Sequence, residues 1–116
     1  MPGTWSVAAR LDDYPSLYEG LKEMTAGRVN ITYAKGSNLI GDVAYEERAT
    51  LFGRSLSRDN RTDKELLDEA LKVASGADVI VAALGESSEM SGESSSRTDL
   101  GIPDVQRTLL EALLKT

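Results

Sequence analysis

Cysteine and histidine are both absent from the 116 residues of this chain. Without cysteine no disulfide can form, and without either residue type the usual Cys/His zinc site is excluded. A Ser-His-Asp or Cys-His nucleophilic centre is likewise excluded within this chain. Any acid–base chemistry must therefore come from Asp, Glu, Lys or Tyr side chains.

Long apolar runs and an excess of basic residues are also missing. The longest apolar run, residues 79–84, has six residues, whereas a membrane-spanning helix needs roughly 20. A net charge of −6 argues against nucleic acid and anionic membranes as partners. The sparse basic stretch formed by Arg54, Arg58 and Arg61 is expected to be solvated or to face another domain. No signal segment opens the chain, which predicts a cytosolic protein or part of a larger one.

Two capping boxes, in which a hydroxyl and a glutamate three residues later bond each other's backbone, mark predicted helix starts. Ser16 with Glu19 predicts a helix over residues 16–26. Thr62 with Glu65 begins a second helix, which Gly76 closes. A third helix runs from Pro103 to Leu113, because proline is favoured at the first helical position.

Two apolar segments between these helices have the composition of strands. Residues 29–34 are rich in β-branched side chains, and residues 79–84 are apolar without alternation, as in a strand covered on both faces of a parallel sheet. Helices alternating with strands predict a layered α/β domain. Two strands make a marginal sheet, so we expect the chain to belong to a larger domain or to self-associate.

The segment 85–102 follows the second predicted strand and is the most informative part of the chain. Its 18 residues include six serines, one arginine and four carboxylates. Connections of this length are usually functional or disordered, and ligands of α/β sheets bind beyond the carboxyl ends of strands. A solvated acidic loop and a loop that binds a ligand are both consistent with this composition. A metal held by carboxylates is a weaker alternative, because the EF-hand spacing is absent. The four carboxylates are Glu86, Glu89, Glu93 and Asp99.

A set of motifs, in order along nearly the whole chain, resembles glycoside hydrolase family 3, and most closely its periplasmic bacterial β-glucosidases. The upstream motifs are Gly3-Thr4-Trp5-Ser6, Leu21 and Tyr33-Ala34-Lys35-Gly36-Ser37-Asn38. The downstream motifs are Gly85-Glu86, residues 90–100 (MSGESSSRTDL), Ile102-Pro103 and Gln106.

The resemblance implies a fold and partners. Residues 1–116 would be a single partial domain, an incomplete flavodoxin-like α/β sandwich with a mostly parallel sheet. A barrel domain of the same protein would supply an aspartate nucleophile, and the substrate would be an oligosaccharide or an aryl β-glycoside. Neither a cofactor nor a metal is implied. The resemblance also implies a periplasmic or secreted protein.

The resemblance also assigns residues. Glu93 matches the general acid/base, the carboxyl group that protonates the leaving oxygen in a retaining glycosidase. Glu89 is its rival, because loop alignments slip by several residues. Arg97 is assigned to substrate binding, and either orients Glu93 or pairs with Asp99. Trp5 either stacks on the leaving-group sugar or covers the sheet near a domain boundary.

These features predict part of a retaining exo-β-glucosidase-like hydrolase, to which the chain contributes the acid/base loop. The isolated chain is then expected to be inactive, because the nucleophile lies in the barrel domain. The alternative is a stand-alone flavodoxin-like binding or interaction module, whose serine-rich loop holds a small polar ligand.

Overall fold

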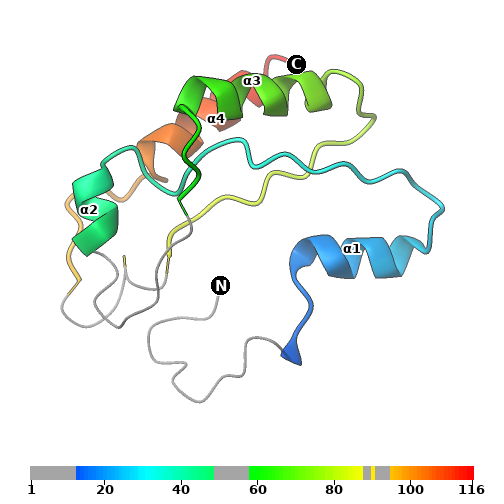
Figure 1. The fold of residues 1–116 in the computed structure, drawn as a ribbon, viewed down its shortest axis with the longest axis horizontal. Coiled ribbons are helices and arrows are strands. Elements are labelled where there is room, and N and C mark those ends of the chain that lie inside the picture. Colours follow the sequence, from blue (N-terminus) through cyan, green and yellow to red (C-terminus); the bar gives the residue numbers. More distant parts are fainter. Residues whose placement is uncertain (1–12, 49–57, 88–89, 91–94) are drawn as a thin grey trace.

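The computed structural model describes residues 13–48, 58–87, 90 and 95–116. Four α-helices lie in these residues: α1 (Leu17–Thr25), α2 (Val43–Arg48), α3 (Asp63–Ala74) and α4 (Asp104–Leu113). Helices α3 and α4 contact each other, whereas α1 stands apart from this pair (Figure 1).

Both predicted capping boxes are confirmed. In α1, Glu19 N donates to Ser16 Oγ at 3.2 Å and Ser16 N donates to Glu19 Oε2 at 2.7 Å. In α3, Glu65 N donates to Thr62 Oγ1 at 3.2 Å and Thr62 N donates to Glu65 Oε2 at 2.8 Å. These bonds satisfy amide groups that the first turn of a helix leaves unpaired. The two helices therefore begin where the local sequence predicts.

The same contacts stabilise the charged form of both glutamates. The backbone N–H of Ser16, followed by its hydroxyl, lowers the pKa of Glu19. The hydroxyl of Thr62, followed by its backbone N–H, lowers the pKa of Glu65. Each carboxylate accepts hydrogen bonds that its protonated form would weaken.

The end of α1 and the start of α4 each differ by about one residue from the prediction. Ala26 takes the left-handed conformation at the C-cap of α1 with φ 46°, just before the predicted stop at Gly27. Pro103 is the N-cap of α4, and Asp104 is the first helical residue. A proline fits there because the N-cap amide is not needed for the helix ladder.

The predicted flavodoxin-like α/β sandwich with a mostly parallel sheet is wrong for the described residues, which form helices and no strand. Residues 29–34 and 79–84 are non-helical, and within the described part no backbone hydrogen bond joins one to the other. Val79 and Val81 on one side are 77% and 61% exposed and Ile80 on the other is 42% exposed, so neither side of the second segment is covered. A strand exists only when a neighbour pairs with it, and an apolar β-branched run records a preference for burial without supplying that neighbour.

The small apolar core lies between α3 and α4. Leu66 of α3 is completely buried, and Leu109 of α4 is 6% exposed. Gly36, in the non-helical segment after α1, packs against this core. A Cβ atom there would lie 2.6 Å from Leu109 Cδ2 and 3.5 Å from Ala70 Cβ. The absence of a side chain and the positive φ of 75° explain why glycine occupies this position.

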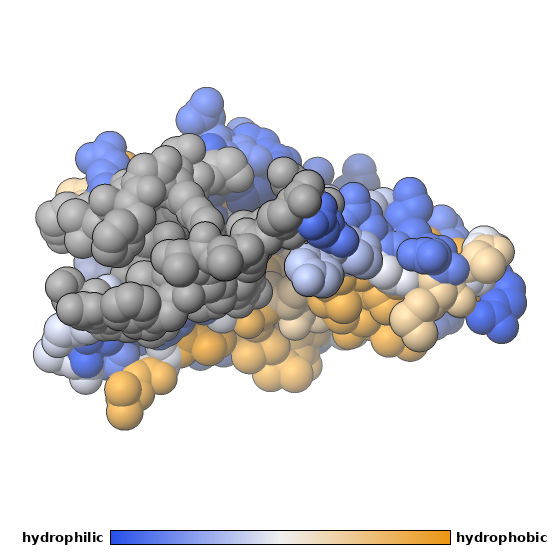
Figure 2. Space-filling model, turned by 90° about the horizontal axis from the view of Figure 1, so that it is seen from below, coloured by the Kyte–Doolittle hydropathy of each residue, from blue (hydrophilic) through white to orange (hydrophobic). Residues whose placement is uncertain are grey.

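Much apolar surface is left uncovered by the described residues. Helix α1 buries none of its residues, and its apolar side chains Leu17 and Met24 are 57% and 77% exposed. Its aromatic contact is between Tyr18 and Tyr33, whose ring centroids lie 5.6 Å apart. Figure 2 shows apolar surface gathered along one side of the face seen from below. Within the described part, every helix is too short or too polar to span a membrane.

Candidate functional site

The residues predicted for the site divide into two groups. Glu93, Glu89 and Trp5 lie outside the described residues, so the roles assigned to them stay predictions. Arg97 is described, together with residues 85–87 and 95–102 on either side of the loop. The geometry that follows is that of the two ends of the loop.

The start of the loop is held by a side chain of α4. Gly85 N donates to Gln106 Oε1 at 2.8 Å, and Gln106 Nε2 donates to Gly85 O at 2.8 Å. The same Nε2 donates to Leu39 O at 2.7 Å. Gln106 is 5% exposed, and burial makes each of these bonds costly to lose. One amide therefore joins α4 to both non-helical segments.

The return of the loop is held by Arg97. Its guanidinium forms an ion pair with Glu86, and Nη2 donates to Gly101 O at 2.9 Å. The side chain of Arg97 is 16% exposed and that of Glu86 is 34% exposed. The partner of Arg97 is thus Glu86, and Asp99 instead accepts from Gly101 N at 2.8 Å. The alternative in which Arg97 pairs with Asp99 is wrong.

Between these anchors, two side chains of the loop point into the protein. Ser87 and Met90 are each 2% exposed, and Met90 N donates to Ser87 O at 3.2 Å. The loop therefore has buried contacts of its own at its first turn.

Sequence reasoning missed the structural roles of Glu86 and Gln106. By sequence, Glu86 is one of four loop carboxylates, and Gln106 is one of the residues that carry the family resemblance. The available signal was their place in that resemblance, at the first residues of the loop and of the helix after it. What each contacts depends on the fold and is not visible in local spacing.

A second polar network joins residues 38–46, which precede residues 49–57, to Arg58 and Asp59, which follow them. Asn38, 2% exposed, donates from Nδ2 to Asp59 O at 3.2 Å and accepts from Asp59 N at 2.8 Å. Arg58 forms an ion pair with the buried Glu46 and donates to Ile40 O at 3.0 Å. These contacts fix the chain on both sides of that interval.

The expectation that the basic stretch is solvated or faces another domain is wrong for Arg58, which pairs with the buried Glu46. Arg61 is exposed as expected, and it also has partners within this domain. Arg61 pairs with Asp59 at 2.8 Å and with Glu69 of α3 at 2.8 Å. The hydrogen bonds from the Arg61 side chain, followed by that from its backbone N–H, hold the pKa of Asp59 well below its usual range. Asp59 and Glu69 in turn raise the pKa of the Arg61 guanidinium. Both arginines thus have carboxylate partners inside this domain. Arg54 lies outside the described residues.

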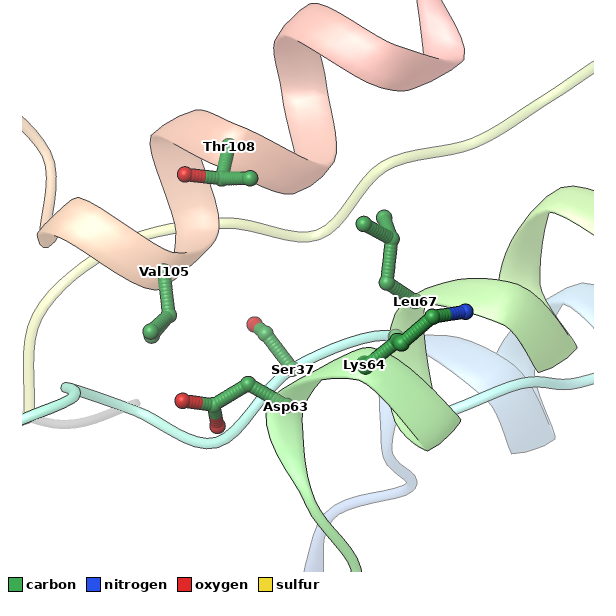
Figure 3. A pocket seen from close by; sticks show the side chains of 7 residues that line it. Ser37, Asp63, Lys64, Leu67, Val105 and Thr108 are labelled. Carbon is green, nitrogen blue, oxygen red and sulfur yellow. The ribbon is translucent and has the colours of Figure 1, made fainter.

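A pocket of about 280 Å³ opens between α3, α4 and the turn at Gly36 (Figure 3). Its lining is formed by Gly36, Ser37, Asp63, Lys64, Leu67, Val105 and Thr108. Lys64 points away from the other labelled side chains, and its Nζ lies 2.5 Å from Asp68 Oδ2. Arg97, the predicted site residue that lies in the described part of the chain, does not line this pocket. Within the described ranges, no three Asp, Glu, Cys or His side chains form a group that could hold a metal ion.

Comparison with known proteins gives the family. The family described as glycosyl hydrolase family 3 C-terminal domain matches residues 1–116. The periplasmic beta-glucosidase of Salmonella typhimurium is 36% identical over 114 residues, which is 98% of this chain and 15% of that protein.

Two further relatives agree with this match. The thermostable beta-glucosidase B of Acetivibrio thermocellus is 34% identical over 104 residues, covering 90% of this chain and 11% of that protein. The beta-xylosidase of Formosa agariphila is 31% identical over 103 residues, covering 89% of this chain and 12% of that protein. The chain therefore spans about a seventh or less of each relative. It belongs to glycoside hydrolase family 3, and corresponds to the C-terminal domain of that family.

Proposed function

We propose that residues 1–116 form part of a longer retaining exo-β-glucosidase-like hydrolase, which removes terminal sugars from β-linked oligosaccharides or aryl β-glycosides. The observation that carries this proposal is the match of the whole chain to the family 3 C-terminal domain. Two relatives are called beta-glucosidases and one a beta-xylosidase. A β-glucoside is therefore the first candidate substrate, and a β-xyloside is its competitor.

In this proposal two carboxyl groups share the chemistry. A barrel domain of the longer protein supplies the aspartate nucleophile, and this chain supplies Glu93 as general acid and then general base. A retaining glycosidase needs these groups about 5–5.5 Å apart on the two sides of the scissile bond. A carboxyl group is the fitting acid here because the chain has no histidine and no cysteine. Glu89, four residues earlier, is the alternative acid.

Trp5 and Arg97 complete the proposed site. An indole ring suits the apolar face of a pyranose, and we assign Trp5 to stacking on the leaving-group sugar. For Arg97, the ion pair with Glu86 supports a role in orienting the loop more than direct substrate contact.

The proposed location is the periplasm or the outside of the cell. Its support is the Salmonella relative, whose name places that protein in the periplasm. The alternative of a stand-alone binding module gains no support from the pocket beside α3, since the described residues of segment 85–102 are not part of its lining.

Replacement of Glu93 by glutamine in the longer hydrolase tests the acid/base role. We expect a loss of about 10²–10⁴-fold in kcat/KM for glycosides with poor leaving groups. Activated aryl glycosides should lose much less, because their leaving groups need no proton. Glu89→Gln is the test of the rival residue, and Glu111→Gln on the exposed side of α4 is the matched control. Equal losses on both substrate types for Glu93→Gln would remove Glu93 from this role.

The chain alone provides a second test. With one of the two carboxyl groups missing, residues 1–116 should release an aryl β-glucoside only at the background rate. Clear turnover by the purified 116-residue chain would contradict the proposal that a separate domain carries the nucleophile.

A further inference from the structure

The ion pair between Glu86 and Arg97 joins two points that are separated by ten residues of loop. Arg97 is also bonded to Gly101 O at 2.9 Å, so its guanidinium spans the start of the loop and its return. Its side chain is only 16% exposed. Solvent and salt screen such a pair less than an exposed one, so it holds its geometry better.

The Glu86 side of this pair is bonded to α4, and the Arg97 side is joined to α4 along the chain. Glu86 follows Gly85, whose backbone N–H and C=O are both bonded to Gln106 at 2.8 Å. Gly101 lies just before α4, and its N–H donates to Asp99 Oδ1 at 2.8 Å. The ion pair therefore closes a ring that runs from Gln106 of α4 to Gly85 and Glu86, across to Arg97, and then along the chain through Gly101 to the start of α4.

We propose that Glu86 and Arg97 are a positioning pair, which holds the start and the return of the loop together at these two residues. A closed loop has fewer conformations, so less entropy is lost when one of its side chains is aimed at a substrate. Arg97 then acts through Glu86 and not by contacting the sugar. A neutral glycoside offers no anion, and the charge of Arg97 is already balanced by Glu86.

This inference rests on the proposed function only for its catalytic consequence, and its structural part is tested on the 116-residue chain. Amide hydrogen exchange of the peptide that contains residues 86–101 is the measurement. Arg97→Met and Glu86→Gln should each raise its exchange rate about tenfold or more, and Arg97→Lys should raise it less. Arg107→Met, the same change at an exposed arginine of α4, is the matched control and should leave this peptide unchanged. Unaltered exchange in both pair variants, or full exchange in the parent chain, would overturn the proposal.

The catalytic consequence is tested in the longer hydrolase by reversing the charges of Glu86 and Arg97. Glu86→Arg and Arg97→Glu alone should each lower kcat by up to about 10²-fold, the cost of misplacing a group by about 1 Å, with little change in KM. The double variant should recover at least part of this loss, because the pair is restored with its charges exchanged. A rise in KM without rescue would instead place Arg97 on the substrate and overturn the positioning role. If the parent hydrolase cleaves no glycoside, the proposed function fails. The exchange experiment would still show whether Glu86 and Arg97 hold the two ends of the loop together.

Discussion

The side-chain amide of Gln106 bonds both backbone polar groups of Gly85, accepting from its N–H and donating to its C=O, each at 2.8 Å. This pairing resembles one step of a β-ladder, but a helical side chain supplies it. Because Nε2 also donates to Leu39 O at 2.7 Å, the two non-helical stretches that follow the predicted strands are joined at this point by α4. The relationship explains how the loop of residues 85–102 can begin at a fixed place in the described, strand-free part of the chain.

Replacement of Gln106 by leucine should therefore lower the free energy of unfolding by about 2–4 kcal/mol, because it leaves three backbone groups without a partner. Denaturant unfolding of the chain, followed by circular dichroism, measures this. Gln106→Glu is the informative companion, since its carboxylate would face the carbonyl oxygens of Gly85 and Leu39. Those oxygens raise the pKa of the new carboxyl, so the stability of this variant should recover as the pH falls and be lost as the pH rises. An equal loss at pH 4 and pH 8 would contradict this geometry.

The α3–α4 contact should depend on Leu66 more than on any exposed leucine. Leu66 has no exposed surface, and Leu66→Ala should cost about 2–5 kcal/mol of unfolding free energy through lost contacts and the cavity left behind. Leu100, 95% exposed, gives the matched variant, and Leu100→Ala should change stability by less than about 0.5 kcal/mol. Thermal or urea unfolding distinguishes them. Similar losses at both positions would mean that the core lies elsewhere.

Gly36 tests the close approach of the non-helical segment to α4. The added Cβ of Gly36→Ala would lie 2.6 Å from Leu109 Cδ2, and the φ of 75° is unfavourable for alanine. We expect a loss of about 1–3 kcal/mol. Gly76→Ala is the control, because nothing lies within 4 Å of its added Cβ. That variant should be neutral or more stable by about 0.4–1 kcal/mol. The unfolding midpoints of the two variants should move apart.

The capping box of α3 should make stability depend on acid pH. The folded-state pKa of Glu65 is lowered by the Thr62 hydroxyl and backbone N–H, so its contribution is complete above the ordinary value of about 4.3. That contribution is lost as the pH falls through the lowered pKa. Glu65→Gln keeps a side chain that can complete the box but does not titrate, so it should flatten this part of the pH profile. An unchanged acid slope in that variant would show that other carboxyls govern it.

The hydroxyl side of the same box gives a separate measurement. Thr62→Ala should lower the unfolding free energy by about 1 kcal/mol at neutral pH, because it removes the acceptor for the Glu65 backbone N–H. Thr62→Ser retains that acceptor and should lose much less. Helix content near neutral pH, measured by circular dichroism during urea unfolding, provides the comparison, and equal effects of alanine and serine would exclude the cap as the cause.

The amino-acid sequence by itself determined where the main helices begin and to which family the chain belongs. Ser16 with Glu19 and Thr62 with Glu65 are three residues apart, so their bonds form within one helical turn and need nothing else from the fold. The motif from Met90 to Leu100 likewise depends only on residue order, and the family match over residues 1–116 agrees with it.

Tertiary structure decided whatever depends on a distant partner. Residues 79–84 have the composition of a buried strand, yet no described neighbour pairs with them, and Val79 is 77% exposed. Gln106 reaches Gly85 and Leu39, which are 21 and 67 residues away in the chain. Arg97 forms its ion pair with Glu86 across the loop, although Asp99 is nearer in the sequence. Local spacing determines the hydrogen bonds within one helical turn. Contacts between residues far apart in the chain depend on which surfaces pack together when the chain folds, and the local sequence pattern does not specify that packing.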